Sequence, residues 1–223
     1  MAKRDRLYET VITEPVDFVF DDRVVKVFPD MINRSVPGYG TIVPMTGMLA
    51  RRYAQPNSRL YDLGCSLGAV SLAMQGAVRT PGTRIIAVDN SPDMIRRLEE
   101  ILAASNPAAG APRIEAVIQD VLETRIDDAS VAVLNFTLQF IDPDQRQELL
   151  CRIAGGLLPG GILVISEKIS FPDPEELSLQ AEWHHDFKRA QGYSELEVAR
   201  KRDALENVMK PDTLPQHQQR LLE

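Results

Sequence analysis

The pattern of apolar and polar positions changes character near residue 58. From there to residue 168, short apolar runs alternate with longer segments in which apolar residues recur at helical spacing. The runs predict strands over 59–63, 84–89, 114–118, 131–136 and 162–165, and the longer segments predict helices over 69–77, 91–105 and 145–158. Strands that alternate with helices are typical of a mostly parallel sheet with helices on both faces, so we predict an α/β fold.

The N-terminal segment, residues 1–57, lacks this alternation and is expected to form a helical cap. Phe18-Val19-Phe20 is a short apolar run, and Asp21-Asp22 begins a capped helix that Pro29 interrupts. Pro37-Gly38 marks a turn, and a second helix is expected over about 41–54 despite an internal proline.

Two further helices are predicted in residues 169–211, after the last strand. One begins at Asp173 and ends by Gly192, and the other follows the capping box Ser194-Glu195-Leu196-Glu197 and stops before Pro211. Because they follow the fifth strand, we expect them over the carboxyl ends of the strands, as a lid or a dimer arm. Residues 212–223 are expected to form a tail helix, and the whole chain a single domain, with two small domains as the alternative.

Composition narrows the class of protein. The 223 residues carry 25 basic and 32 acidic side chains, a formal net charge of −7, and the basic ones are scattered. This balance disfavours direct nucleic-acid binding, which usually shows a clustered basic surface. No apolar stretch approaches the length of a membrane span. The two cysteines, Cys65 and Cys151, have no paired ligand spacing, so we expect reduced thiols in a cytoplasmic protein and no metal.

The most informative stretch is Asp62-Leu63-Gly64-Cys65-Ser66-Leu67-Gly68, a glycine-containing turn between the first predicted strand and helix. Asp89 ends the next strand, 89 − 62 = 27 residues later. A glycine turn lets backbone approach a ligand closely, and a carboxylate at the end of the second strand can accept from both hydroxyls of a ribose. The order of these features predicts a nucleoside site at the carboxyl ends of the strands.

The kind of nucleotide follows from what the turn lacks. A dinucleotide site usually carries G-x-G-x-x-G, but here Ser66 occupies the position of the middle glycine. Asp62 stands just before the turn, where a carboxylate suits a ligand with an ammonium group better than a pyrophosphate. A nicotinamide oxidoreductase is therefore disfavoured.

These residues resemble the class I S-adenosylmethionine-dependent transferases, which have a Rossmann-like fold. The resemblance covers residues 58–168 through Tyr61–Ser66, Ala87–Ser91, Gln119-Asp120 and Leu158–Gly161. It implies that Gly64, Cys65 and Ser66 line the methionine part of the cofactor and that Asp89, with Asn90 beside it, holds the ribose. It also implies that Asp120 accepts from the adenine amine and that the backbone of Val121 contacts adenine.

A narrower resemblance, to the carboxy-S-adenosyl-L-methionine synthases, covers nearly the whole chain. It is carried by Ser35–Tyr39, Asp89–Pro92, Leu134–Phe140, Ser166–Lys168, His184–Arg189, Gly192–Glu197, Lys201-Arg202 and Leu205–Met209. It implies transfer of a carboxyl group from prephenate to the methyl carbon of S-adenosyl-L-methionine, with release of phenylpyruvate. The product, carboxy-S-adenosyl-L-methionine, is used by a separate enzyme on the wobble uridine of certain tRNAs.

The same resemblance assigns further residues. Arg202 clamps the carboxylate and reaches the site of the partner subunit in a homodimer, while Tyr39 and Asn135 contact the ligand. A guanidinium is suited to this because it binds a carboxylate with two hydrogen bonds. No side chain is assigned as the proton-abstracting base, which the substrate itself could supply. His184-His185 is a weak candidate, because adjacent residues on a helix face different ways.

Two other functions remain open from the sequence: an ordinary methyltransferase acting on a small molecule or tRNA, and a non-catalytic nucleotide-binding module. One departure from the family is expected to matter. Its members usually continue past the tail helix with two strands that complete the sheet, whereas only five strands are evident here. The fifth strand is then expected to have an exposed edge.

Overall fold

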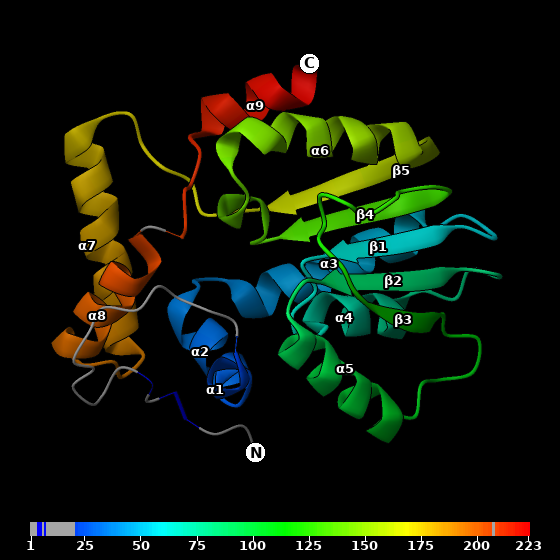
Figure 1. Cartoon of the computed structure of the whole chain (residues 1–223), viewed down its shortest axis with the longest axis horizontal. Helices are drawn as coiled ribbons and strands as arrows, with labels where there is room; N and C mark the ends of the chain where they lie inside the picture. The colour runs from blue at the N-terminus through cyan, green and yellow to red at the C-terminus, as the bar shows by residue number, and fades with distance from the viewer. Residues whose placement is uncertain (1–3, 6, 8–20, 207) are drawn as a thin grey trace. The chain divides into compact units, whose positions relative to one another are not determined.

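The computed structural model describes residues 4, 5, 7, 21–206 and 208–223 (Figure 1). The chain divides into two compact units. Gly40–Glu167 forms the first, which we call the sheet unit, and Met1–Tyr39 with Lys168–Glu223 forms the second, the helical unit.

The sheet unit contains a five-stranded sheet in the order β3-β2-β1-β4-β5, in which every neighbouring pair is parallel. Consecutive strands are joined by helices or loops, as a parallel sheet requires. The strands are β1 (Arg59–Leu63), β2 (Arg84–Asp89), β3 (Arg113–Ile118), β4 (Ala129–Asn135) and β5 (Leu157–Ser166). The helices of this part of the chain are α3 (Tyr39–Tyr53), α4 (Ala69–Ala77), α5 (Pro92–Ala104), the short η1 (Leu138–Phe140) and α6 (Pro143–Gly156).

Each face of the sheet is covered by helices, as predicted. Successive strand residues alternate between two buried apolar clusters, because side chains of a strand point to opposite faces in turn. Leu60 packs in the cluster that holds residues of α3, α4 and α5, whereas its neighbour Tyr61 packs in the cluster that holds residues of α6. Val133 and Leu134 of β4 divide in the same way.

Three of the predicted elements, 59–63, 69–77 and 84–89, begin and end where expected. The boundary between α6 and β5 was predicted wrongly. The helix ends at Gly156 rather than at residue 158, because β5 already begins at Leu157, which pairs with Ala129. Gly156 allows this sharp change, since a Cβ there would lie 2.3 Å from the carbonyl oxygen of Ile126. Pro159-Gly160-Gly161 was expected to end the helix. It lies instead within β5, where the pairing register between β4 and β5 shifts.

The first helices of the helical unit are α1 (Asp22–Val25) and α2 (Phe28–Ser35). Asp21 caps α1 as predicted, accepting from the backbone N–H groups of Arg23 and Val24. Pro29 was expected to interrupt this helix, but it lies in the first turn of α2, where its missing N–H has no cost. The predicted run Phe18–Phe20 lies outside the described residues.

The remaining helices are α7 (Pro174–Ala190), α8 (Glu195–Glu206) and α9 (Leu214–Leu222). The predicted capping box is present at α8: Ser194 Oγ accepts from Glu197 N at 3.3 Å, and Glu197 Oε2 accepts from Ser194 N at 2.8 Å. The lid or dimer-arm role of α7 and α8, and the single-domain layout, stay predictions. None of the helices in the described part of the chain has the length and apolarity needed to cross a membrane.

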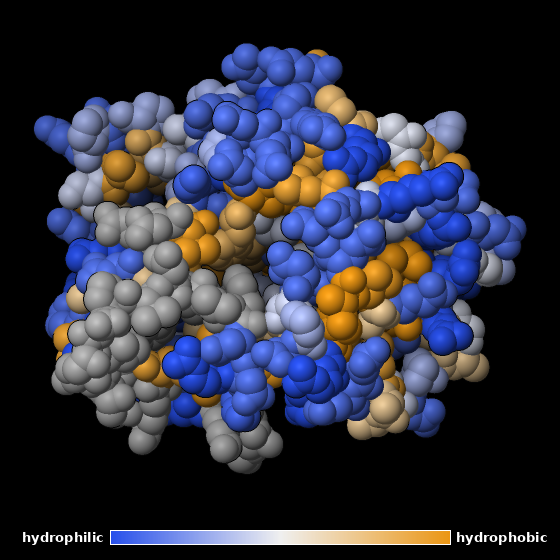
Figure 2. Space-filling model, in the orientation of Figure 1, coloured by the Kyte–Doolittle hydropathy of each residue, from blue (hydrophilic) through white to orange (hydrophobic). Residues whose placement is uncertain are grey.

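Polar residues predominate on the face shown in Figure 2, where apolar residues form separate orange patches. This distribution is expected of a chain in which 26% of the residues are charged.

Candidate functional site

The strands of the sheet unit carry polar residues where they end. Gly64 follows β1, Asp89 is the last residue of β2, Asp120 follows β3 by two positions, and Asn135 is the last residue of β4. Because parallel strands run in one direction, these residues are gathered at the carboxyl edge of the sheet, where open α/β sheets bind ligands. The sequence predicted all four at the ligand.

The turn after β1 needs glycine for a steric reason. Gly64 has a φ of 80°, and a Cβ added there would lie 2.5 Å from side-chain atoms of Thr137. The N–H groups of Gly64 and Cys65 both donate to the carbonyl of Val88, at 2.8 and 2.9 Å. The turn is therefore fastened to β2, and the Cys65 N–H, predicted to matter more than the thiol, is engaged in this contact.

Asp89 organises the carboxyl edge. Its Oδ2 accepts from Ser66 N at 2.8 Å and its Oδ1 accepts from Ser91 N at 2.9 Å. The side chain is buried, and this burial raises its pKa. A carboxylate oxygen accepts two hydrogen bonds, so each oxygen keeps one acceptor position that no described residue fills. Two positions on one rigid carboxylate match the two hydroxyls of a ribose.

Asp62, the residue before Leu63 in β1, has only 1% of its surface exposed. Its Oδ2 accepts from the backbone N–H of Ser71, in the first turn of α4, at 2.9 Å and from the Ser71 hydroxyl at 2.6 Å. Burial raises the pKa of this carboxyl to about 6. In a dinucleotide site, pyrophosphate occupies the N–H groups at such a helix start. Here carboxylates of the chain occupy both the helix start and the Ser66 N–H, an arrangement that favours a cationic ligand.

Asp120 and Val121 follow β3. Asp120 Oδ1 accepts from Leu122 N at 2.8 Å, an Asx-turn that fixes the carboxylate. Gln119 N donates to the carbonyl of Asp89 at 3.0 Å and so connects this loop to the end of β2. Val121 is buried in an apolar cluster, and Asn90 is exposed. Their predicted contacts with adenine and ribose stay predictions.

Asn135 at the end of β4 carries an unusual feature. Its Oδ1 is buried and has no hydrogen-bond partner among the described residues. A buried polar atom without a partner is rare in proteins, because its desolvation is not compensated. A ligand hydroxyl or amine would supply the donor that the described residues do not.

Two residues that the sequence analysis did not single out hold the loop after Asn135. The carboxylate of Glu167 accepts from the N–H groups of Thr137, Leu138 and Gln139, at 3.0, 2.7 and 3.2 Å. Burial raises the pKa of Glu167 to about 7. Thr137 Oγ1 donates to the carbonyl of Leu63 at 2.8 Å. Glu167 is thus connected through Thr137 to the glycine turn. Its signs in the sequence were its place directly after β5 and its position within Ser166–Lys168, one of the blocks that carry the family resemblance.

Tyr39 and Arg202 belong to the helical unit, so their predicted contacts with the ligand stay predictions. Tyr39 is half-buried at the first position of α3. Arg202 lies on α8 with 61% of its side chain exposed, and its guanidinium pairs with Asp203 at 3.0 Å. His184 is hydrogen-bonded through Nε2 to the carbonyl of Ser35 at 2.8 Å, and burial lowers its pKa to about 4. The ring is neutral near pH 7 and anchors α7 to α2.

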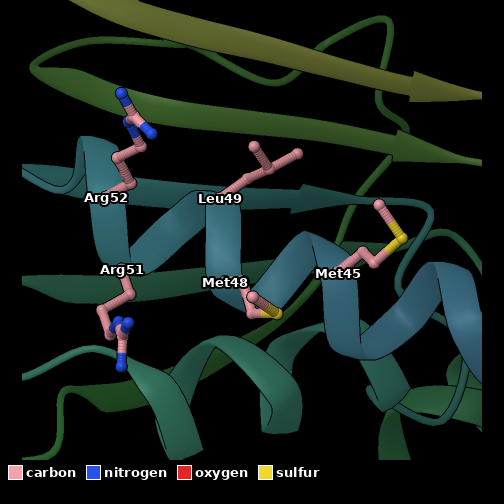
Figure 3. A pocket seen from close by; sticks show the side chains of 5 residues that line it. All are labelled: Met45, Met48, Leu49, Arg51 and Arg52. Carbon is pink, nitrogen blue, oxygen red and sulfur yellow. The ribbon is translucent and has the colours of Figure 1, made fainter.

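A pocket elsewhere in the sheet unit lies on α3 (Figure 3) and shares no residue with the carboxyl edge. It is lined by Met45, Met48, Leu49, Arg51 and Arg52. These side chains offer an apolar surface beside two cations, without a carboxylate, histidine or thiol. In the described part of the chain, no group of three or more histidine, cysteine or acidic side chains is placed to hold a metal ion.

Comparison with known proteins assigns the fold first. Residues 60–161 match the family model described as a methyltransferase domain. Among solved structures, the plantazolicin methyltransferase BpumL superimposes with a TM-score of 0.61 at 14% identity, covering 91% of this chain and 69% of that one. The chain therefore has the class I methyltransferase fold, as predicted.

Closer relatives define the family. The chain is 56% identical over 219 residues to a carboxy-S-adenosyl-L-methionine synthase of Trichlorobacter lovleyi, covering 98% of this chain and 89% of the relative. It is 55% identical over 223 residues to that of Pseudomonas putida strain GB-1, covering 99% and 90%. The chain belongs to the carboxy-S-adenosyl-L-methionine synthase family, which confirms the resemblance noted in the sequence.

Proposed function

We propose that this enzyme transfers a carboxyl group from prephenate to the methyl carbon of S-adenosyl-L-methionine, giving carboxy-S-adenosyl-L-methionine and phenylpyruvate. The observation that carries the proposal is identity above 50% along almost the whole chain to synthases of this name. An ordinary methyltransferase would share the fold but not this similarity, which extends through the helical unit as well.

The carboxyl edge of the sheet unit fits the adenosyl ligand. The free acceptor positions on Asp89 suit the ribose hydroxyls, with Asn90 beside it, and the unpartnered Oδ1 of Asn135 needs a donor. Asp120 and Val121 are assigned to adenine. The turn Gly64-Cys65-Ser66 is assigned to the methionine part, close to the buried carboxylate of Asp62.

The reaction balances without an added base. When bound, S-adenosyl-L-methionine supplies a methyl group whose protons are acidic, because the adjacent positive sulfur stabilises a carbanion. Prephenate loses its ring carboxyl group and its ring hydroxyl as the ring becomes aromatic. The departing hydroxide accepts a methyl proton and leaves as water, while the carboxyl carbon bonds to the methyl carbon. Asp89 and Asn135 orient the nucleoside so that the methyl carbon of S-adenosyl-L-methionine faces the carboxyl group of the donor.

Arg202 is assigned to the transferred carboxylate, and Tyr39 to the covering of the ligand. Arg202 lies on the exposed side of α8, and Asp203 accepts from both its Nε and its NH2. A substrate carboxylate competes for these same donors, since a guanidinium binds a carboxylate with two hydrogen bonds. We infer that Arg202 acts in the site of a partner subunit and that the enzyme is a homodimer. The product would then serve a separate enzyme of tRNA wobble-uridine modification in the cytoplasm, without direct tRNA contact by this chain.

The reaction is tested by incubating the purified full chain with S-adenosyl-L-methionine and prephenate and analysing the products by mass spectrometry. We expect an adenosyl product heavier by the mass of carbon dioxide, together with phenylpyruvate. Unchanged S-adenosyl-L-methionine with folded enzyme, or S-adenosylhomocysteine with a methylated acceptor, would contradict the proposal.

The site is tested by Asp89→Asn, measured as the dissociation constant of S-adenosyl-L-methionine. An amide keeps one acceptor oxygen and replaces the other with a donor, so we expect binding to weaken by about ten- to a hundredfold. Asp93→Asn is the matched control, because Asp93 lies in the first turn of α5 and pairs with Arg96. Equal affinities for the two variants would refute the assignment of Asp89.

A further inference from the structure

Two charged side chains of the sheet unit hold the ends of the short helix η1, which follows β4. The carboxylate of Glu167 accepts from the backbone N–H groups of residues 137–139 at 3.0, 2.7 and 3.2 Å. At the other end, Arg146 of α6 donates from Nε and Nη2 to the carbonyl of Ile141 at 3.0 and 2.8 Å. Arg146 is fully buried, and Ile141 directly follows the last residue of η1. The position of η1 is therefore fixed from both sides.

The backbone between β4 and η1 is strained. Phe136 has a φ of 59°, in the left-handed region that a residue with a side chain seldom adopts. Its N–H donates to the carbonyl of Ser166 at 2.7 Å. Such a conformation persists only where the surrounding structure holds it. The three hydrogen bonds to Glu167, which begin at the very next residue, supply that constraint.

Thr137 connects this loop to the glycine turn after β1. Its Oγ1 donates to the carbonyl of Leu63 at 2.8 Å, and its N–H is one of the three that Glu167 accepts. Its side chain also fills the space beside Gly64, where an added Cβ would lie 2.5 Å from it. Any movement of η1 would therefore displace the residue packed against the turn that is assigned to the methionine part of the ligand.

Asn135 lies on the other side of the strained residue. It pairs with Ser166, the residue before Glu167, and its Oδ1 is buried without a partner among the described residues. Because a hydrogen bond depends on distance and direction, this oxygen can accept from a ligand only if the end of β4 stays in place. Asn135 and the glycine turn thus meet at one loop, and Glu167 is the side chain that fastens it.

We propose that Glu167 is a positioning residue of the S-adenosyl-L-methionine site, which holds residues 136–139 so that Asn135 and the glycine turn lie where the ligand binds. This inference rests on the proposed function, which assigns those residues to the ligand. Glu167 acts through the loop and not by touching the ligand. Removal of its charge should therefore weaken binding of S-adenosyl-L-methionine.

The hydrogen bonds of Glu167 depend on its ionised form. A carboxylate only accepts, whereas protonation turns one of its oxygens into a donor. Burial raises the pKa of Glu167 to about 7, against the opposing effects of the three N–H groups and of Arg146. Affinity for S-adenosyl-L-methionine should then fall as the pH falls through about 7. Asp62 and Asp89 at the same edge also have raised pKa values, so their titration has to be separated from that of Glu167.

The experiment measures the dissociation constant of S-adenosyl-L-methionine for the full chain by calorimetry, without prephenate. Glu167→Gln keeps the shape of the side chain and replaces one acceptor oxygen with a donor. We expect it to weaken binding by about tenfold near pH 8, where the natural side chain is ionised. Glu148→Gln is the matched control, because it makes the same change in a side chain of α6 that is 80% exposed, and it should bind within about twofold of the natural chain.

The pH profile distinguishes positioning by the carboxylate from a general loss of stability. Between about pH 8 and pH 6 the natural chain should lose up to about tenfold in affinity as Glu167 is protonated. Glu167→Gln should lose less, because only Asp62, Asp89 and the ligand itself still titrate there. The difference between the two profiles belongs to Glu167, and identical profiles would overturn the inference.

Thr137→Val gives an independent test of the same loop. Valine keeps the shape of threonine but cannot donate to Leu63, so binding of S-adenosyl-L-methionine should weaken. Its effect and that of Glu167→Gln should not add in the double variant, because both act on one loop. Thermal unfolding shows which variants are folded in the assay. The inference is overturned if folded Glu167→Gln binds as tightly as Glu148→Gln or, should Glu167→Gln not fold, if folded Thr137→Val binds as tightly as the natural chain.

The product assay separates this inference from the proposed function. If the natural chain forms the carboxylated product and Glu167→Gln leaves the dissociation constant unchanged, the positioning role is refuted and the function stands. If binding of S-adenosyl-L-methionine depends on Glu167 but no carboxylated product forms, the positioning role stands and the function is refuted.

Discussion

The two units of this chain bury different kinds of side chain. Both buried apolar clusters of the described residues lie within the sheet unit, one on each face of the sheet. The buried residues of the helical unit include several polar ones, Asp5, Ser35, Lys188 and Lys201. Lys201 contacts Ser35 and Asp5, and the Tyr193 hydroxyl donates to Asp5. One unit is organised mainly by removal of apolar surface from water and the other to a large extent by specific polar contacts.

This difference has a physical consequence. Apolar burial is non-directional and tolerates small displacements, whereas a buried ammonium or carboxylate group is stable only when a partner lies at the right place. The polar arrangement in the helical unit therefore depends on where each group lies, while the apolar packing of the sheet unit tolerates small displacements. The predictions below test this contrast, from the largest expected effect to the smallest.

Replacing a buried methionine by alanine in each unit should give the largest difference between the units in the free energy of unfolding. Met74 on α4 is fully buried within an apolar cluster, and Met74→Ala should lower the free energy of unfolding by about 2–5 kcal/mol. Met31 on α2 is 4% exposed but belongs to neither cluster, so Met31→Ala should cost less. Denaturant unfolding measures both, with the exposed Met48→Ala as control. A larger loss for Met31 than for Met74 would break the comparison.

The units should respond to pH with opposite signs. In the sheet unit, burial raises the pKa of Asp62 to about 6 and of Glu167 to about 7, above their ordinary values of 3.8 and 4.5. The folded state then holds more protons than the unfolded state between about pH 4 and 7, so these groups make stability fall as pH rises through that window. In the helical unit, burial lowers the pKa of Lys201 to about 7 and of Lys188 to about 8, from 10.5. There the unfolded state holds more protons, so stability rises between about pH 7 and 10.

Urea unfolding across this pH range measures the effect, which should be of the order of 1–3 kcal/mol for each window. Asp62→Asn should flatten the acidic side of the profile and Lys201→Met the alkaline side. If Asp62→Asn leaves the slope between pH 4 and 7 unchanged, Asp62 is not the group that titrates.

Removal of one hydroxyl tests the polar network of the helical unit. Tyr193→Phe deletes the hydrogen bond to the buried Asp5 and should cost about 1–3 kcal/mol, because a buried acceptor loses a donor. The half-buried Tyr53 of α3 is the control. Tyr53→Phe should change the free energy of unfolding by less than about 0.5 kcal/mol. Equal effects of the two substitutions would show that the network does not stabilise the unit.

Removing a helix cap in each unit should give the smallest difference in stability between the two units. Ser91 Oγ accepts from Met94 N at 3.2 Å in a buried position of the sheet unit, and Ser91→Ala should cost about 1 kcal/mol or more. Thr213 caps α9 from a partly exposed position, so water can replace its hydroxyl and Thr213→Ala should cost less. Thermal unfolding of the two variants measures which of them loses more stability. A larger loss for Thr213→Ala than for Ser91→Ala would contradict the prediction.

The sequence predicted much of the sheet unit because each of its elements has a local cause. Strands β1 and β2 are apolar runs, α5 begins with a serine cap and a proline, and the glycine turn after β1 is short and distinctive. The same locality explains why Asp89, Asp120 and Asn135 were predicted at one edge, since they follow strands that run in parallel. The start of β5 was missed because strand pairing with Ala129, and not any local preference, makes Leu157 extended.

Contacts between distant residues could not be predicted in this way. The sequence by itself determined the order of strands and helices and the acidic residues at the strand ends, since these depend on periodicity and on neighbours along the chain. Only the tertiary structure decided that Glu167 holds the Thr137 loop, that Asn135 Oδ1 has no partner among the described residues, and that Lys201 is buried beside Ser35 and Asp5. Each of these depends on which polar atoms meet across the fold, and hydrogen bonds and charge pairs are specified by distance and direction that a linear pattern does not contain.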